Sequence, residues 1–152
     1  MVTSHQLEEQ YFAAIVEGAD LVAHGEADAA EQVYRRAVEL GSKLDGGSGL
    51  RSAEAQLHLA TCHAEQNEFV EALDELTAVV TNLRGVEGAD PGLVGRAAMS
   101  RAAVFAALDR MDEAVTDAEE AIALLERAGD DYKGLVANAR QLLVGIAASR
   151  SD

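Results

Sequence analysis

Three residues in the middle of the chain have side chains that commonly bind metals: His58, Cys62 and His63. His58 and Cys62 are four residues apart, a spacing that places two ligands on one face of a helix. A structural zinc site needs four ligands, and the sequence around this pair offers no evident third or fourth one. His63 falls on a position that the repeat pattern described below assigns to packing. We therefore expect these side chains to pack in the core or line a groove, and we expect no metal and no cofactor.

Acidic pairs are frequent, for example Glu8 with Glu9 and Glu119 with Glu120. Neighbouring residues on a helix point in different directions, so such pairs cannot work together as a catalytic acid and base. Gly46–Gly49 is rich in glycine, but no Lys-Ser/Thr follows it and no strand precedes it, so it is a flexible linker and not a phosphate loop. A nucleophile elbow and a metalloprotease helix motif are also missing. We expect no catalytic residues and a protein that is not an enzyme.

The charge of the chain restricts its partners. There are 27 acidic and 12 basic residues, a formal net charge of −15, which opposes binding to nucleic acids and to anionic membranes. A basic partner fits this charge, and the alternative is that the acids only solvate an exposed face. Cys62 is the single cysteine, so no intrachain disulfide can form. We expect a cytoplasmic protein, because no signal peptide and no apolar run of membrane-spanning length is present. The ten arginines against two lysines suggest a GC-rich bacterial genome.

A regular repeat organises most of the sequence. Ala30, Ala72 and Ala114 occupy the same place in three similar segments, and the differences between their numbers, 72 − 30 and 114 − 72, are both 42. A fixed period of this size indicates stacked supersecondary units rather than a compact enzyme fold. The sequence therefore favours a helical surface that binds something.

Apolar residues at helical spacing predict seven helices in one domain over residues 1–152. Ser4 is suited to cap the first helix, and Gly25 to end it. Asp90 and Pro91 together form a start signal for the fifth, with Asp as the cap and Pro in the first turn. The last helix has no partner after it and is expected to cover the sixth, with a dimer contact as the alternative. The predicted helices span residues 4–23, 28–44, 50–65, 69–83, 91–108, 112–127 and 131–149.

The small and bulky residues of the three units resemble the tetratricopeptide repeat (TPR), a helix–turn–helix unit. That family pairs a small and a bulky residue on the first helix with alanine and bulky residues on the second. The resemblance implies an all-α, right-handed TPR-like solenoid of three repeats (about 4–45, 50–85 and 90–128) with a C-terminal capping helix (about 131–149). The residues that carry it are Gly18, Leu21, Ala30, Tyr34 and Ala37; Leu59, Ala60, His63, Ala72, Leu76 and Val79; and Ala102, Phe105, Ala114, Ala118 and Ala121.

Some positions depart from the family pattern. The usual TPR unit is about 34 residues long, and these units are longer by 8 (42 − 34), which resembles the long-repeat variant of kinesin light chain and of many bacterial regulators. Glu17 and Arg101 stand where the family has an apolar residue, so we expect the outer units to pack less ideally. The Trp often found early in the unit is missing as well.

The family lines a concave groove with the first helix of each unit, which implies a peptide-binding site here. Its side chains are mostly apolar, and we expect them to receive an apolar or amphipathic segment of another protein. The alternative is that they pack within the stack or against the capping helix. The implied groove residues are Phe12, Ile15, Ala19 and Val22; Leu57, His58, Thr61 and Ala64; and Arg96, Met99, Ser100, Ala103 and Ala106.

Three functions are compatible with such a surface. The first is a protein-interaction module, an adaptor or scaffold, with a homodimer possible. The second is a regulatory or sensor module of a bacterial signalling or transcription system. The third is a chaperone of the secretion type, although those chaperones resemble the 34-residue form of the repeat. Fold alone does not choose among these functions.

Overall fold

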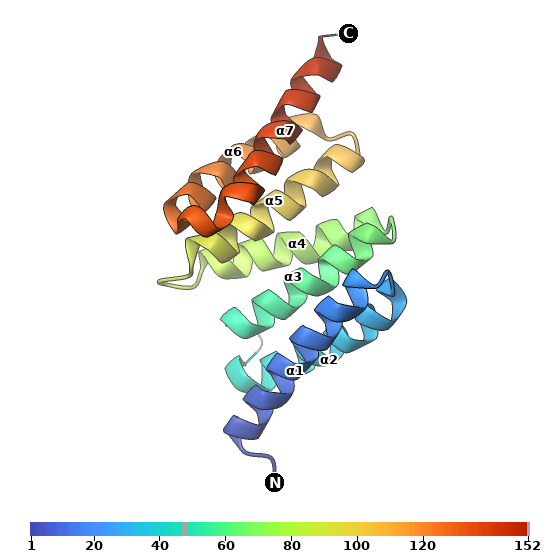
Figure 1. Cartoon of the computed structure of the whole chain (residues 1–152). Coiled ribbons are helices and arrows are strands. Elements are labelled where there is room, and N and C mark those ends of the chain that lie inside the picture. The colour runs from blue at the N-terminus through green and yellow to red at the C-terminus, as the bar shows by residue number, and fades with distance from the viewer. Residues whose placement is uncertain (47–48, 152) are drawn as a thin grey trace. The chain divides into compact units, whose positions relative to one another are not determined.

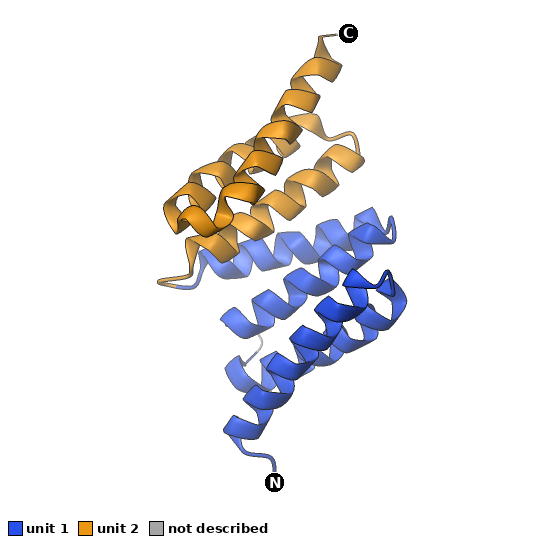
Figure 2. Ribbon diagram, in the orientation of Figure 1, with its two compact units in different colours: residues 1–86 blue, residues 87–152 orange. Residues whose placement is uncertain are grey.

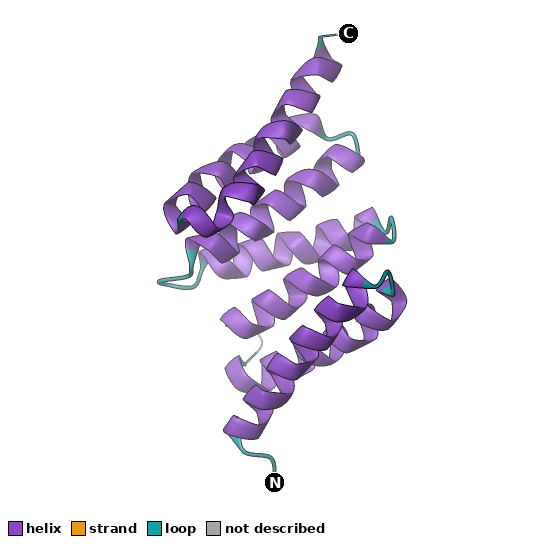
Figure 3. Cartoon of the chain, in the orientation of Figure 1, coloured by secondary structure: helices purple, strands orange, loops and turns teal. Residues whose placement is uncertain are grey.

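Figure 1 shows a computed structural model of the chain, which describes residues 1–46 and 49–151. These residues form helices joined by short loops, and no strand occurs among them (Figure 3). The predicted all-α class is confirmed. The elements are α1 (Ser4–Ala23), α2 (Ala27–Asp45), α3 (Leu50–Glu65), α4 (Phe69–Arg84), α5 (Pro91–Ala107), α6 (Met111–Ala128), the short 3-10 helix η1 (Asp130–Tyr132) and α7 (Lys133–Arg150).

The helices group into two compact units, Met1–Val86 and Glu87–Asp152 (Figure 2). In the first unit α1 packs on α2, α2 on α3, and α3 on α4. In the second unit α5 packs on α6, and α6 on α7. The single domain over residues 1–152 stays a prediction. Gly47 and Ser48 of the predicted linker lie outside the described residues.

The 42-residue period of the sequence is also visible in the backbone conformation of the turn that joins the two helices of each pair. Gly25, Asn67 and Asp109 all have positive φ, at 76°, 64° and 60°. The next residue in each turn donates its N–H to a backbone carbonyl of the preceding helix. The hydrogen bond is 2.8 Å long in all three turns; in the first, Glu26 donates to Leu21. Asn and Asp are the non-glycine residues that adopt this conformation most readily. Three turns of one geometry therefore connect α1 to α2, α3 to α4, and α5 to α6.

The small residues of the repeat lie where paired helices approach closely. Ala30, Ala72 and Ala114 are fully buried. Gly18 lies against Tyr34, and a Cβ at residue 18 would overlap the Tyr34 ring. The larger side chain in α2 thus occupies the space left by the missing one in α1, as the small–bulky pattern predicts.

Two helix starts are predicted from their capping residues, with different outcomes. Asp90 caps α5 by accepting a hydrogen bond of 3.0 Å from the N–H of Gly92, which confirms the prediction. The cap of α1 is Thr3, and the prediction of Ser4 is wrong by one residue. The Thr3 hydroxyl accepts from the Gln6 N–H, and the Gln6 side chain accepts from the Thr3 N–H. This reciprocal pair satisfies two otherwise free donors, which favours Thr3 over Ser4.

Helix α7 packs on α6, as a capping helix should. Val136 of α7 is buried with Ala121 and Leu125 of α6 and Ala98 of α5. Tyr132 of η1 packs against this cluster and lies so close to Gly92 that a Cβ there would overlap its ring. None of the described helices combines the length with the hydropathy that a membrane span requires.

Candidate functional site

Helix α1 exposes an apolar stripe beside the side that it buries. Phe12 is 52% exposed and Val16 is 61% exposed, and Ala19 and Ala23 are exposed as well. These residues are four, three and four apart, so they form one stripe along a helix. We call the four residues the α1 face. Large apolar side chains left in water on one stripe are typical of an interaction site.

Two of the predicted groove residues on α1 turn toward the core instead. Ile15 and Val22 are half-buried and pack against Tyr34, Leu59 and Cys62. They therefore make the contacts within the stack that the alternative interpretation expects. Phe12 and Ala19 keep the exposure that a binding role requires.

Arg51 of α3 supports the α1 face from the side. Its guanidinium carbon lies 5.2 Å from the centroid of the Phe12 ring and 5.9 Å from that of Tyr11. Its terminal nitrogen lies 3.0 Å from the Glu8 carboxylate, and its carbonyl accepts a 3.0 Å hydrogen bond from the Tyr11 hydroxyl. These contacts tie the first turn of α3 to α1 and fix the Phe12 ring. Val16 and Arg51 were not identified from the sequence, because the family pattern does not assign binding to their positions.

The predicted groove residues on α3 are less accessible. Leu57 is only 2% exposed and belongs to the core. His58 stacks on the Tyr34 ring, with centroids 5.0 Å apart and an angle of 12°. The Thr61 hydroxyl donates to the Leu57 carbonyl at 2.9 Å. His58, Thr61 and Ala64 are half-buried.

The second unit contributes the remaining predicted residues, all on α5. Ala103 is exposed, while Arg96, Ser100 and Ala106 are half-buried. Met99 packs against the cluster that contains Leu125 and Val136. A binding role for these residues, and for those of the first unit, stays a prediction.

Arg101 departs from the repeat pattern but pairs within the same unit. Its Nε and one terminal nitrogen donate to the two Asp117 oxygens, at 2.6 Å and 2.9 Å. The side chains are 13% and 5% exposed, and the Arg101 guanidinium also lies 5.6 Å from the Phe105 ring centroid. The hydrogen bonds with Asp117 raise the pKa of Arg101 despite its burial. A bidentate ion pair thus replaces the apolar contact that the family has here.

His63 is buried among carboxylates, which the sequence did not indicate. Its ring is 5% exposed, and its Nε2 lies 2.7 Å from Oε1 of Glu31 on α2. Its Nδ1 lies 2.6 Å from Oε1 of Glu75 on α4, off the ideal hydrogen-bond direction. Oε2 of Glu68, the residue before α4, is 4.0 Å from Nε2. The residues come from α2, α3 and the α4 segment, so their spacing along the chain gives no hint of this contact.

The contacts and burial in this cluster shift the pKa values of His63, Glu31 and Glu75. Burial lowers the pKa of His63, but the contacts with Glu31 and Glu75 outweigh burial and raise it. Hydrogen bonds from His63 and Arg35 lower the pKa of Glu31. Burial raises the pKa of Glu75. His63 thus lies between two carboxylates, Glu31 and Glu75, that favour its protonated form.

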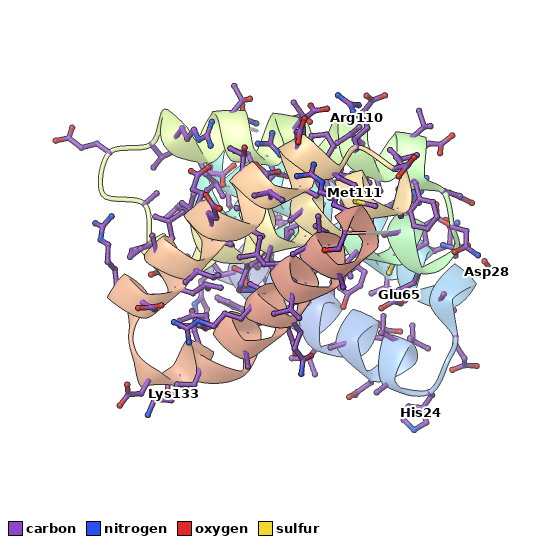
Figure 4. All side chains as sticks on the ribbon, turned by 90° about the horizontal axis from the view of Figure 1, so that it is seen from above. His24, Asp28, Glu65, Arg110, Met111 and Lys133 are labelled. Carbon is purple, nitrogen blue, oxygen red and sulfur yellow. The ribbon has the colours of Figure 1, made fainter. Side chains whose placement is uncertain are left out.

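The single cysteine of the chain is buried, whereas His24 is exposed. Cys62 is 1% exposed, and burial raises the pKa of its thiol to about 11. The thiolate is the reactive form, so Cys62 is inert at neutral pH. The His58 ring stacks on the Tyr34 ring. His24, labelled in Figure 4, lies in the turn after α1, and its Nδ1 is 2.7 Å from the Asp20 carbonyl oxygen of that helix.

No protein-family model matches the sequence, and no curated protein matches it. Solved structures of low sequence identity are nevertheless similar over nearly the whole chain. PcrH from Pseudomonas aeruginosa has a TM-score of 0.70 and 19% identity, covering 97% of this chain and 96% of that one. The type III secretion translocator chaperone SycD from Yersinia enterocolitica has a TM-score of 0.72 and 16% identity, covering 100% and 90%.

A third similar structure comes from outside the secretion chaperones. It is a putative kinesin light chain from Podosopora anserina with nearly identical TPR-like repeats, at a TM-score of 0.65 and 18% identity, covering 99% and 78%. Together these likenesses show that the fold is a TPR-like helical repeat. They do not separate the long 42-residue variant from the ordinary one.

Proposed function

We propose that this chain is a protein-interaction module that binds an amphipathic segment of another protein on the α1 face, without chemistry of its own. The exposure of Phe12 and Val16 carries this proposal, because α1 buries its other side and still leaves two large apolar side chains in water. Removing a side chain of this size from water contributes roughly 1.5–3 kcal/mol. Two such anchors at positions i and i+4 suit a partner helix or an extended segment with apolar residues at a matching spacing.

The charge of the first unit defines the partner further. Residues 1–86 contain 15 acidic and five basic residues, a formal charge of −10 out of −15 for the chain. Glu9 and Asp20 are both exposed. Glu9 lies seven residues before Val16 and Asp20 lies four residues after it, so the two acids are at the two ends of the row of side chains that contains Val16. Acids at both ends of an apolar stripe favour a partner with Lys or Arg flanking its apolar anchors.

A chaperone of the secretion type is the second candidate. The observation that favours it is the likeness to PcrH and SycD, which covers nine-tenths or more of each chain. PcrH has been crystallised with the chaperone binding regions of PopB and PopD, so that protein binds segments of two others. The 42-residue length of the repeat argues against this function. We give more weight to the structural likeness. If this candidate is correct, the partner is a translocator-like segment, and it would still bind on the α1 face.

The test selects partners by their chemistry. A library of random 16-residue peptides is displayed and enriched on the purified full chain, and the enriched peptides are sequenced. We expect apolar residues three or four apart with Lys or Arg nearby. Binding of these peptides should be lost with Phe12→Ser/Val16→Ser, a change that leaves the core intact because both side chains are exposed.

The control is Val70→Ser/Val144→Ser, which removes two exposed valines elsewhere, 62% and 69% exposed. Enriched peptides that are acidic, or that bind both double variants equally, would contradict the proposal. If the chain enriches no peptide and sediments as a dimer that Phe12→Ser/Val16→Ser separates, the occupant of the α1 face is a second copy instead.

A further inference from the structure

Glu31, His63 and Glu68 form a cluster with the composition of a metal site. Oε1 of Glu31, Nε2 of His63 and Oε2 of Glu68 lie within 4.8 Å of one another. We propose that these three side chains bind one divalent transition-metal ion in the seam between α2, α3 and the start of α4.

The three ligand atoms lie close to the spacing that a single ion of this size requires. Metal–ligand bonds to histidine nitrogen and carboxylate oxygen are about 2.0–2.2 Å long, so ligand atoms on one ion lie about 3–4 Å apart. Nε2 of His63 is 2.7 Å from the Glu31 oxygen and 4.0 Å from the Glu68 oxygen. The first distance is shorter than this range and the second is at its upper end, so both carboxylates would have to rotate for the three atoms to bind one ion.

Glu75 gives His63 the support that metal-binding histidines have. It faces Nδ1 at 2.6 Å, on the opposite side of the ring from Glu31 and Glu68. Once this contact, which is off the ideal hydrogen-bond direction, is aligned, a carboxylate beside Nδ1 would keep the proton of a neutral imidazole there and leave the lone pair of Nε2 for the ion. Gln56 in turn donates to the other Glu75 oxygen at 3.2 Å, which fixes the orientation of that carboxylate. The arrangement is thus ordered on both sides of the ring.

The ligand set selects the class of ion. One imidazole nitrogen with two carboxylate oxygens suits Zn²⁺, Co²⁺ or Mn²⁺, whereas Mg²⁺ and Ca²⁺ prefer oxygen ligands alone. Glu68 is 47% exposed, so the ion reaches the site from solvent past this residue. Arg35 pairs with the same Glu31 oxygen at 2.8 Å, and its exposed side chain must swing aside when the ion binds. Three protein ligands leave a further position for water.

Binding would hold three helices of the first unit together. Glu31 belongs to α2, His63 to α3 and Glu68 to the cap of α4, so one ion connects the second helix of one repeat to both helices of the next. An ion that binds only the folded chain stabilises it by mass action. This inference stands independently of the peptide-binding proposal.

The test uses isothermal titration of the chelator-treated full chain with ZnCl₂ at pH 7. His5→Ala is present throughout, because the exposed pair His5–Glu9, 3.0 Å apart, could bind zinc on its own. We expect one ion per chain, and at least tenfold weaker binding with Glu68→Gln, which removes a ligand without disturbing the core. Glu71→Gln is the control, since it removes an exposed acid from the first turn of α4. Thermal unfolding should show a zinc-dependent rise for the parent and for Glu71→Gln, and a smaller one for Glu68→Gln.

Two results would overturn the site. One is that no ion binds, which means that His63 serves only as a structural contact between Glu31 and Glu75. The other is equal zinc affinity of Glu68→Gln and Glu71→Gln, which means that any zinc is held by other surface acids.

Discussion

At the scale of single residues, the contact between Gly18 and Tyr34 is a close fit within the first repeat. We predict that Gly18→Ala destabilises the protein, because a Cβ at residue 18 overlaps the buried Tyr34 ring, which is itself stacked on His58. Overpacking of this kind costs about 1–3 kcal/mol, more than the roughly 1 kcal/mol that alanine gains over glycine in a helix. Urea unfolding followed by circular dichroism measures the change.

Gly145→Ala is the matched control, since a Cβ there meets nothing within 4 Å and α7 is regular around it. It should stabilise the protein by about 0.5–1 kcal/mol. Equal effects of the two substitutions would contradict the close approach of α1 and α2.

His63 gives the stability of the metal-free chain a dependence on pH. Its pKa is raised in the folded state by Glu31 and Glu75, so its contribution is complete below its ordinary value and is lost as pH rises through the folded value. The pKa of Glu31 is lowered, so its contribution is present above its ordinary value and is lost as pH falls. The two groups therefore limit the stability of the fold from opposite sides of the pH range.

We therefore predict that the free energy of unfolding, measured by urea titration in chelator, declines as pH rises above the ordinary histidine pKa of 6.5. In His63→Gln this decline should flatten. His5→Gln, a change at an exposed histidine, should keep it. A His63→Gln profile parallel to that of the parent would show that the cluster does not carry the dependence.

At this scale the sequence predicts burial better than chemistry. The burial of His63 follows from the repeat pattern, but the acids around it do not. Glu31 belongs to α2, whereas Glu68 and Glu75 belong to the cap and the middle of α4, and only folding brings them to the ring. The family pattern places Leu57 in the groove, whereas the structure buries it.

At the scale of helices, the ion pair between Arg101 of α5 and Asp117 of α6 connects the two helices of the third repeat. We predict that Asp117→Ala lowers the free energy of unfolding by roughly 2–4 kcal/mol, because it leaves a largely buried guanidinium without a partner. The double variant Arg101→Met/Asp117→Leu should recover most of this loss, since a matched apolar pair needs no counter-charge. Chemical denaturation of the parent and both variants measures the loss and its recovery.

The exposed pair Arg110–Glu113, at 2.7 Å with side chains 46% and 49% exposed, is the comparison. Glu113→Ala should change stability by less than about 1 kcal/mol. If Asp117→Ala and Glu113→Ala lose the same stability, burial does not govern the strength of these pairs.

The helices themselves are predictable because apolar periodicity and capping residues are properties of the local sequence. Their starts and ends differ by no more than two residues from those expected, and the start of α5 follows from Asp90 and Pro91. The short η1 helix before α7 was missed, because Gly129 with φ of 119° starts a turn that helical periodicity does not reveal. The sequence predicts only part of the α1 face. An apolar stripe has the same sequence pattern whether a neighbouring helix covers it or it is exposed to solvent.

At the scale of the whole molecule, the charge controls how partners approach. With −10 on the first unit and −15 on the chain, a cationic peptide should be attracted before it makes contact. We predict that the association rate constant of an enriched peptide falls about tenfold or more between about 50 mM and about 500 mM salt, while the dissociation rate changes little. Stopped-flow fluorescence measures both rates.

Glu9→Gln/Asp20→Asn should reduce this dependence on salt, because it removes the acids at the ends of the Val16 row. Glu119→Gln/Glu126→Gln removes two exposed acids of the second unit and serves as the control. A salt effect confined to dissociation would argue against steering.

The central claim is that the α1 face binds the partner, and its most direct test is the dissociation constant of one enriched peptide. It is measured by fluorescence anisotropy with the parent chain, Phe12→Ser/Val16→Ser and Val70→Ser/Val144→Ser, each first shown to be folded by circular dichroism. Loss of two anchors worth about 1.5–3 kcal/mol each predicts at least a hundredfold weaker binding for the first variant and no change for the second. Equal dissociation constants for all three proteins would contradict the claim.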